Sequence, residues 1–289
     1  MTKGGGSRPS GCKIFYMKID MHTHAFAEPI VERAMAALKA NIPPDFHTPF
    51  DGRLPSLIRE LKSHGFDHAA LCQIATKPSQ FAPILDWSRA IRDGRLGEDA
   101  ARMILPLPSV HPDDPELGAH VREIAREGFK GIKLHPYYQG FVLDDAVPLD
   151  LFRMARDNGL FVEIHAGFDI GFPFEDVCGP RRTMRVIESV PGLRLMISHF
   201  GGWKAWDEAD KVLVGAPVDL EISMSVGWCD PVLLRSMLLR HPADRLYFGS
   251  DWPWSEYDKT LPFLDSLGLP AERKAALMGG NAARFLGLP

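Results

Sequence analysis

From Met17 onward, short apolar runs alternate with longer stretches in which apolar residues recur every three or four positions. The short runs predict β-strands, and the periodic stretches predict amphipathic helices. Strands are expected at residues 17–22, 67–73, 102–107, 131–135, 161–165, 194–198, 218–224 and 245–249. Helices are expected at residues 28–40, 57–64, 81–92, 115–127, 147–157, 179–190, 205–214, 231–240, 257–267 and 271–286.

The predicted strands are apolar on both faces, which is typical of a parallel sheet covered by helices. Eight strand-then-helix units in 289 residues predict an α/β protein with a (β/α)8 TIM-barrel fold, and a doubly wound open sheet is the alternative. Because no repeat or linker interrupts residues 17–289, we expect one barrel domain there. Residues 1–16 are rich in Gly, Ser and Lys and lack an apolar signal-peptide core, so they are expected to form a flexible extension.

In α/β barrels, catalytic groups lie at the carboxyl ends of the strands. His22 ends the first predicted strand and His24 follows it. His165 ends the fifth strand, and His199 and Asp251 follow the sixth and the eighth. Alternate residues of a strand share a face, so His22 and His24 should point the same way. Each residue alone has an ordinary explanation, as a surface pair, a buried hydrogen-bonded histidine or a turn cap. Their joint placement at the strand ends predicts one metal site.

The sequence around these residues resembles the amidohydrolase superfamily. Within it, the chain is similar to the metal-dependent TIM-barrel hydrolases that also include the aminocarboxymuconate semialdehyde decarboxylase-like enzymes. The segments that carry the resemblance are Asp20-Met21-His22-Thr23-His24, Glu163-Ile164-His165-Ala166-Gly167, Ser198-His199-Phe200-Gly201-Gly202, Gly249-Ser250-Asp251-Trp252-Pro253 and Gly280-Asn281-Ala282-Ala283-Arg284-Phe285-Leu286. The resemblance extends from about Met17 to Leu288, and it is specific for the superfamily but not for any one substrate.

This resemblance implies that His22, His24, His165 and Asp251 bind a divalent metal. His199 would lie beside the metal, as a second-site ligand or hydrogen-bonded to the reactive water. Imidazoles with one carboxylate suit Zn²⁺ best, and Mn²⁺ or Fe²⁺ are alternatives. Asp251 would take a proton from activated water, and His199 would polarise a substrate carbonyl. The same residues could instead support loss of CO₂ with His199 as the base, so hydrolysis and decarboxylation both stay open.

Two details bear on that choice. Decarboxylases of this branch often carry a Glu at or near the first histidine, whereas this chain has a plain His-x-His, which favours hydrolysis mildly. Binuclear members bridge two metals with a carboxylated Lys or a Glu on the fourth strand, and Lys133 lies on that strand but two residues before its end. We therefore expect one metal. A catalytically inactive barrel with a binding role is the third alternative.

The loops after the strands should form the substrate pocket. The residues expected to contact substrate are Lys133, His135, Tyr137, Arg181 and Trp252. Arg181 with Arg182 could bind a substrate carboxylate, and the alternative is that both belong to a solvated helix start. Further aromatic residues near the strand ends would line an apolar mouth, namely Phe26, Tyr138, Phe168, Trp228 and Trp254. Such a pocket suggests a small cyclic or carboxylated substrate.

Composition narrows the possible partners. With 33 basic and 37 acidic residues, the net charge of −4 does not favour nucleic acid or an anionic membrane surface, and a small molecule is the expected partner. No apolar run reaches the roughly 18 residues that a membrane span needs. Four scattered cysteines without a C-x-x-C pair are typical of reduced thiols in the cytoplasm. Barrels of this kind often pair, so a homodimer is the expected assembly if the chain associates.

Overall fold

The computed structural model describes residues 17–288, and the expected extension at residues 1–16 lies outside the described residues. Each of the eight predicted strands has a counterpart in the described chain. The strands are β1 (Ile19–Thr23), β2 (His68–Cys72), β3 (Ile104–Leu107), β4 (Gly131–Leu134), β5 (Phe161–Ile164), β6 (Leu195–Ile197), β7 (Asp219–Glu221) and β8 (Leu246–Tyr247).

The strands pair in sequence order and in parallel, β1 to β3 in one group and β4 to β8 in another. Backbone hydrogen bonds join the two groups at both seams. Lys133 N–H donates to Pro108 O at 3.0 Å between β4 and the end of β3, and Met21 N–H donates to Phe248 O at 2.8 Å between β1 and the end of β8. The strands therefore close into a ring, which confirms the predicted (β/α)8 barrel and excludes the open sheet.

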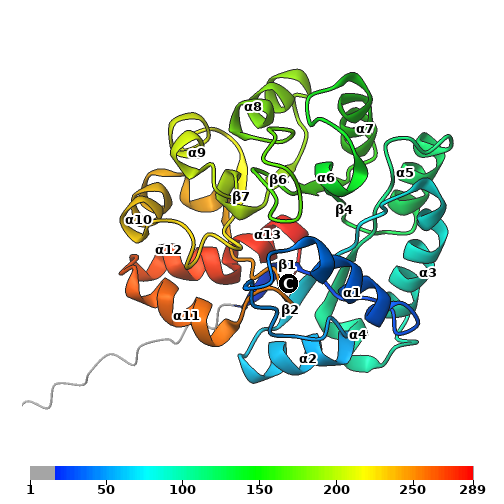
Figure 1. The fold of residues 1–289 in the computed structure, drawn as a ribbon, viewed down its shortest axis with the longest axis horizontal. Helices are drawn as coiled ribbons and strands as arrows, with labels where there is room; N and C mark the ends of the chain where they lie inside the picture. The colour runs from blue at the N-terminus through cyan, green and yellow to red at the C-terminus, as the bar shows by residue number, and fades with distance from the viewer. Residues whose placement is uncertain (1–16, 289) are drawn as a thin grey trace, which may run out of the picture.

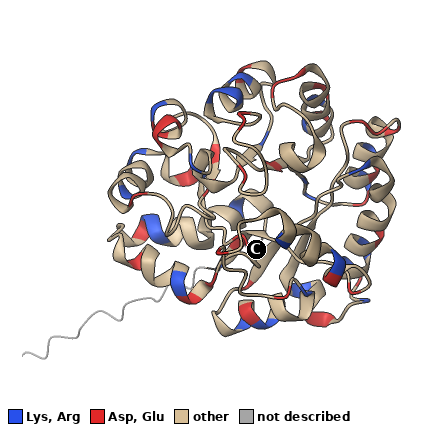
Figure 2. Cartoon of the chain, viewed as in Figure 1, with Lys and Arg blue, Asp and Glu red and all other residues tan. Residues whose placement is uncertain are grey.

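Helices surround the ring of strands, as Figure 1 shows. The larger ones are α1 (Val31–Asn41), α2 (Leu54–Ser63), α3 (Phe81–Arg92), α5 (Leu117–Arg126), α7 (Ala146–Asp157), α8 (Pro180–Ser189), α9 (Trp206–Val212), α10 (Pro231–Arg240) and α11 (Tyr257–Ser266). Basic and acidic residues are interspersed along these helices (Figure 2), and many are paired, as Arg89 is with Glu123 and Glu127. Among the described helices, none has both the length and the apolar character that crossing a membrane requires.

Two short helices, α4 (Glu98–Met103) and α6 (Pro136–Gln139), are absent from the sequence-based prediction. Helix α4 occupies the first two residues of the expected strand 102–107, and a helix this short shows no clear period in the sequence. Helix α6 directly follows β4, with Pro136 in its first turn and Gly140 in a left-handed conformation (φ 67°) after its last residue. The polypeptide after β4 is therefore turned sharply at the mouth of the barrel.

The predicted closing helix 271–286 is interrupted. It consists of α12 (Ala271–Ala275), a π-helical turn (Ala276–Gly280) and α13 (Asn281–Leu286). A side chain at Gly279 would overlap the Met17 carbonyl, so the backbone preceding β1 packs directly against the glycine. This close approach explains why the helix widens there, and the sequence pattern alone did not indicate it.

Strand residues alternate between two apolar clusters. Leu195 and Ile197 of β6 belong to the large core between the strands and the helices, whereas Met196 belongs to a second cluster that includes Ala282 and Leu286 of α13. Since alternate strand residues point to opposite faces, Met196 faces the barrel interior. Helix α13 thus contributes apolar side chains to one end of the interior, and polar side chains gather toward the carboxyl ends of the strands.

Candidate metal centre

Three side chains meet where β8 returns to β1. His22 Nε2 lies 3.1 Å from His24 Nε2, and Asp251 Oδ1 lies 3.2 Å from His24 Nε2 and 3.5 Å from His22 Nε2. The backbone sets this arrangement, because Asp251 N–H donates to His22 O at 2.7 Å. Asp251 adopts a left-handed conformation (φ 63°), which is unfavourable for a residue with a side chain and recurs at functional sites.

The hydrogen bonds of the two imidazoles indicate their tautomers. His22 Nδ1 donates to the Glu221 carboxylate at 2.9 Å, and His24 Nδ1 donates to the Cys72 carbonyl at 2.7 Å. In the neutral rings both Nε2 atoms then carry lone pairs. Lys133 Nζ lies 3.2 Å from the one on His22, but the two lone pairs still face one another at 3.1 Å and repel unless a cation lies between them. Ligand atoms spaced in this way fit a common ion at about 2.0 to 2.2 Å from each. The residues present therefore suit a divalent metal.

His165, the fourth ligand expected from the resemblance, does not belong to this triangle. Its Nδ1 lies 2.9 Å from His199 Nε2, and its Nε2 donates to the Phe168 carbonyl at 3.1 Å. Its ring stacks on that of His135, with centroids 4.1 Å apart. The structure thus connects His165 to the rest of the site through His199.

His199 lies between His165 and His22. Its ring centroid is 5.3 Å from that of His22, and its Nδ1 lies 2.9 Å from Ser223 Oγ. Trp206 Nε1 donates to the His199 carbonyl at 3.0 Å, and the His199 backbone is left-handed (φ 58°). The buried imidazole is therefore held from several sides in an orientation that faces the candidate site.

A second group of ligand-type residues, His135, His165 and Asp169, lies beside the first. The planes of the two imidazoles are only 15° apart in their stack. Because imidazole lone pairs lie in the ring plane, two stacked rings cannot both point at one ion. His135 therefore fits a role in orienting His165, and its own Nδ1 is buried with no hydrogen-bond partner among the described residues.

Lys133, expected to contact substrate, is completely buried in the barrel interior. Its Nζ lies 3.0 Å from Ser198 Oγ, 3.2 Å from His22 Nε2 and 3.3 Å from Glu163 Oε1. Burial lowers its pKa, but the Glu163 carboxylate and other acidic groups outweigh burial and raise the pKa above its usual value. Lys133 is therefore an internal cation, and it lies beneath the mouth where a substrate would enter.

The electrostatic environment keeps the candidate ligands in metal-binding form. Burial, with Lys133 nearby, lowers the pKa of His22 well below its ordinary value, and burial with the neighbouring His135 lowers that of His165 to about 3. Burial alone would raise the pKa of Asp251, but His22 and His24 outweigh it and hold the pKa below its usual range. At neutral pH the imidazoles of His22 and His165 are thus neutral and the Asp251 carboxylate is ionised, as metal coordination requires.

The remaining expected substrate contacts differ in their placement. Tyr137 is partly buried, and its hydroxyl donates to the Gly167 carbonyl at 3.2 Å. Trp252 is fully buried and stacks on Phe50, so it packs beneath the surface rather than lining an open mouth. Arg181 is 70% exposed and pairs with Glu208, which corrects the expected position. It lies in the first turn of α8, which agrees with the solvated helix start that the sequence left as the alternative.

Two acidic residues inside the strands belong to the site but were not predicted from the sequence. Glu163 and Glu221 are completely buried, and both carboxylates lie within 3.5 Å of His22 Nδ1. A signal for them exists in the sequence: Glu163 stands two residues before His165, and Glu221 two before Ser223. Residues two apart in a strand share a face, so an acidic residue in an otherwise apolar strand could have been assigned to the barrel interior.

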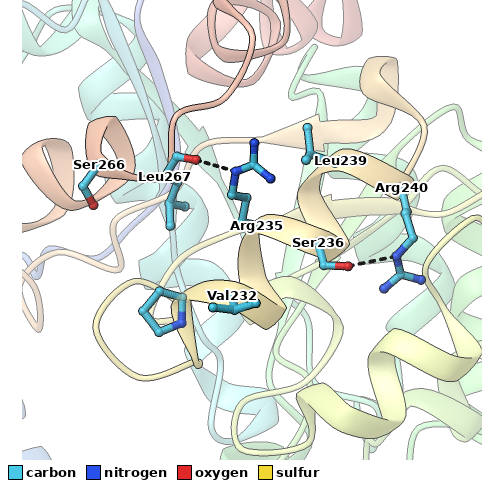
Figure 3. A pocket seen from close by; sticks show the side chains of 8 residues that line it. Val232, Arg235, Ser236, Leu239, Arg240, Ser266 and Leu267 are labelled. Carbon is cyan, nitrogen blue, oxygen red and sulfur yellow. Dashed lines mark hydrogen bonds between the residues drawn. The ribbon is translucent and has the colours of Figure 1, made fainter.

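A surface pocket of about 530 Å³ lies away from these residues. Figure 3 shows its lining, which comes from α10 and the end of α11: Pro231, Val232, Arg235, Ser236, Leu239, Arg240, Ser266 and Leu267. Arg235 Nε donates to the Leu267 carbonyl at 2.8 Å and thereby links the two helices. None of the candidate site residues lines this pocket, so it takes no part in the metal centre.

A closed (β/α)8 barrel with ligand-type side chains at the ends of its strands defines the class of barrel enzymes whose chemistry occurs at that face. The sequence matches the amidohydrolase family over residues 19–288. The chain therefore belongs to this family and is an enzyme of the amidohydrolase superfamily, as the sequence motifs predicted. No curated protein matches the sequence.

Solved structures show the same fold. A protein from Pseudomonas putida, assigned as a 2-pyrone-4,6-dicarboxylic acid hydrolase, is 18% identical with a TM-score of 0.63, and the match covers 95% of this chain and 99% of that one. A manganese-bound 5-carboxyvanillate decarboxylase from Novosphingobium aromaticivorans is 15% identical (TM-score 0.68, 94% and 97% covered). A zinc-bound amidohydrolase from Burkholderia multivorans is 18% identical (TM-score 0.64, 94% and 100% covered).

Proposed function

We propose that the protein is a metal-dependent hydrolase that uses activated water on a small amide, lactone or related carboxylated or cyclic substrate. The observation that carries this proposal is the facing pair of Nε2 lone pairs on His22 and His24, with the ionised Asp251 beside them. We propose these three residues as metal ligands and His165 as the fourth. Zn²⁺ fits such ligands best, and relatives of this fold hold zinc or manganese.

When bound, a divalent ion supplies a Lewis acid that activates water near neutral pH. Asp251 is ionised, and its carboxylate can accept the proton that a reacting water releases and later deliver it to the leaving group. His199 is held by Ser223 and faces His165, so its imidazole can polarise a substrate carbonyl or stabilise the charge that develops on it. The buried setting strengthens these interactions because water is excluded.

The alternative on the same scaffold is non-oxidative decarboxylation of a small aromatic or unsaturated carboxylic acid. His199 would be the base in this reaction: it is buried, and burial lowers its pKa well below the usual value, so the ring is unprotonated at neutral pH. The same lowered pKa makes the ring a weaker base, so burial does not by itself favour this alternative. A 5-carboxyvanillate decarboxylase also shares the fold. Both reactions act on small molecules. The three cysteines within residues 17–288, Cys72, Cys178 and Cys229, are buried free thiols, which supports our proposal that the protein works in the cytoplasm.

A substrate panel tests the proposal. Protein loaded with Zn²⁺ or Mn²⁺ is incubated with lactones, amides and aromatic carboxylic acids, and both hydrolytic product and CO₂ are measured. We expect hydrolytic product, and at least a 100-fold loss of it in Asp251→Asn, since removal of a catalytic acid–base typically costs about 10²–10⁴-fold. The exposed Asp150→Asn on α7 is the matched control. Release of CO₂ alone would replace this proposal with the alternative, and an active Asp251→Asn variant would refute both.

A further inference from the structure

Among the side chains outside the candidate ligand set, Glu221 makes the shortest contact with His22. It ends β7, is completely buried, and accepts a hydrogen bond from His22 Nδ1 at 2.9 Å. An imidazole that donates from Nδ1 keeps its lone pair on Nε2, and His22 Nε2 is the atom that faces His24 and Asp251. Lys133 Nζ, which can only donate, lies 3.2 Å from His22 Nε2 and also favours a lone pair there. When a metal takes that lone pair, the partner of Nδ1 is the contact that still orients the ring.

Both oxygens of the Glu221 carboxylate are held in place. Ser223 Oγ donates to Oε2 at 2.7 Å, and the Ser223 backbone N–H donates to Oε1. Gly249, at the end of β8, leaves the space that this carboxylate needs, because a Cβ atom there would overlap Glu221 Oε1. Residues after β7 and β8 thus hold the Glu221 carboxylate and leave space for it.

We propose that Glu221 is a positioning residue that fixes His22 in the Nδ1–H tautomer and so prepares Nε2 for the metal. This inference rests on the proposed function only in taking His22 as a ligand, and it adds a residue that does not itself touch the ion. Contacts between a metal-binding histidine and a carboxylate on its other nitrogen typically contribute 10- to 100-fold in metal affinity.

Glu221→Gln is the informative substitution. The Ser223 backbone N–H can only donate, so the amide oxygen of glutamine takes the Oε1 position and its NH₂ group faces His22 Nδ1. That group donates, which makes Nδ1 the acceptor and moves the His22 proton to Nε2. Glu221→Gln also removes a negative charge, and this loss alone would weaken metal binding. The change of the His22 tautomer is therefore the result that distinguishes a positioning role from an effect of charge.

The experiment therefore has two readouts on the full chain. The first is ¹⁵N NMR of the metal-free protein, which reports the tautomer of His22. The second is the affinity for Zn²⁺, measured by competition with a chelator of known affinity. We expect Glu221→Gln to shift His22 to the Nε2–H tautomer and to weaken Zn²⁺ binding 10- to 100-fold while binding stays stoichiometric at high Zn²⁺. Asp219→Asn, a buried acidic residue on the same strand whose partners are Tyr247 and Arg245, is the matched control and should change neither readout.

Gly249→Ala tests the same contact while every ligand and charge is retained. We expect it to weaken Zn²⁺ binding, and to have no further effect in a chain that already carries Glu221→Gln, because both changes act on one contact. Additive losses would mean that Gly249→Ala acts through Asp251 instead and would count against the proposal.

Three results would overturn the inference: an unchanged His22 tautomer in Glu221→Gln, an unchanged affinity, or complete loss of the ion, which would make Glu221 a ligand. Failure of the hydrolase proposal gives a different result, namely tight Zn²⁺ binding and the expected tautomers without hydrolytic product. The two proposals are therefore tested separately.

Discussion

His241 provides a sharp test of how burial governs the acid stability of this barrel. It follows α10, is completely buried, and donates from Nε2 to the Val218 carbonyl at 2.9 Å. Its Nδ1 accepts a hydrogen bond from Gly215 N–H at 3.3 Å. Both ring nitrogens are thus matched to the neutral imidazole, and a second proton on Nδ1 would face a donor. Burial is the main reason that the pKa of His241 falls from 6.5 to about 4.

The sign of the effect follows from the two pKa values. His241 takes up a proton below about pH 6.5 in the unfolded chain but only below about pH 4 in the folded chain. Because the unfolded chain binds more protons between these values, the free energy of unfolding decreases as the pH falls through that interval. The stabilisation is complete above pH 6.5. A difference of about 2.5 pKa units corresponds to about 3 kcal/mol at the acid end.

The assay is urea unfolding from pH 7.5 to pH 4.5 with a chelator present, so that release of metal does not contribute. Glutamine has an NH₂ group for Val218 and an oxygen for Gly215, but it does not titrate, so His241→Gln should lose about 2 to 3 kcal/mol less than the parent chain across this range. His47→Gln, at a side chain that is 69% exposed, is the matched control and should follow the parent chain. Parallel curves for His241→Gln and the parent chain would refute the reasoning.

Two further predictions concern the site. Removing metal with a chelator should lower the melting temperature, and Zn²⁺ or Mn²⁺ at about 100 times its dissociation constant should restore about 2.7 kcal/mol; an unchanged melting temperature would contradict metal binding to the folded chain. Gly167→Ala should lose activity several-fold and destabilise the fold by more than about 1 kcal/mol. Gly167 has φ 89°, and a Cβ there would overlap the Trp203 backbone, which accepts a hydrogen bond from the Phe168 N–H and so helps to hold the loop. Activity with a panel substrate and thermal unfolding check the second prediction, and a fully active, stable variant would contradict it.

The fold could be predicted from the sequence because each strand is a short, mainly apolar run and the barrel repeats one unit. The same geometry explains why His22, His24 and Asp251 could be assigned to one site, since all strands of a barrel end on the same side. The interruption of the last helix at Gly279 could not be predicted. It depends on the Met17 carbonyl, which is far away in sequence and packs against the glycine in the fold.

For Arg181 the sequence left two placements open, a contact with substrate and a solvated helix start. A residue that follows a strand end by many positions lies on a connecting segment, and the direction of that segment depends on contacts that the sequence pattern does not contain. The structure places Arg181 in the first turn of an outer helix, where Glu208 pairs with it. Residues within the strands are better constrained, because their spacing determines the face on which they lie.

The charges around His22 give an independent reason to expect a divalent ion. The charged groups that the structure places within 3.5 Å of its ring nitrogens are the carboxylates of Glu163, Glu221 and Asp251 and the ammonium of Lys133. With all three carboxylates ionised and Lys133 protonated, their net charge would be two minus in a region that excludes water, where unpaired charge is costly. Burial, with the charge of Glu163, accordingly raises the pKa of Glu221 well above its usual value. One divalent cation between His22 and His24 would balance the buried charge and keep all three carboxylates ionised, whereas a monovalent ion would leave a charge unpaired.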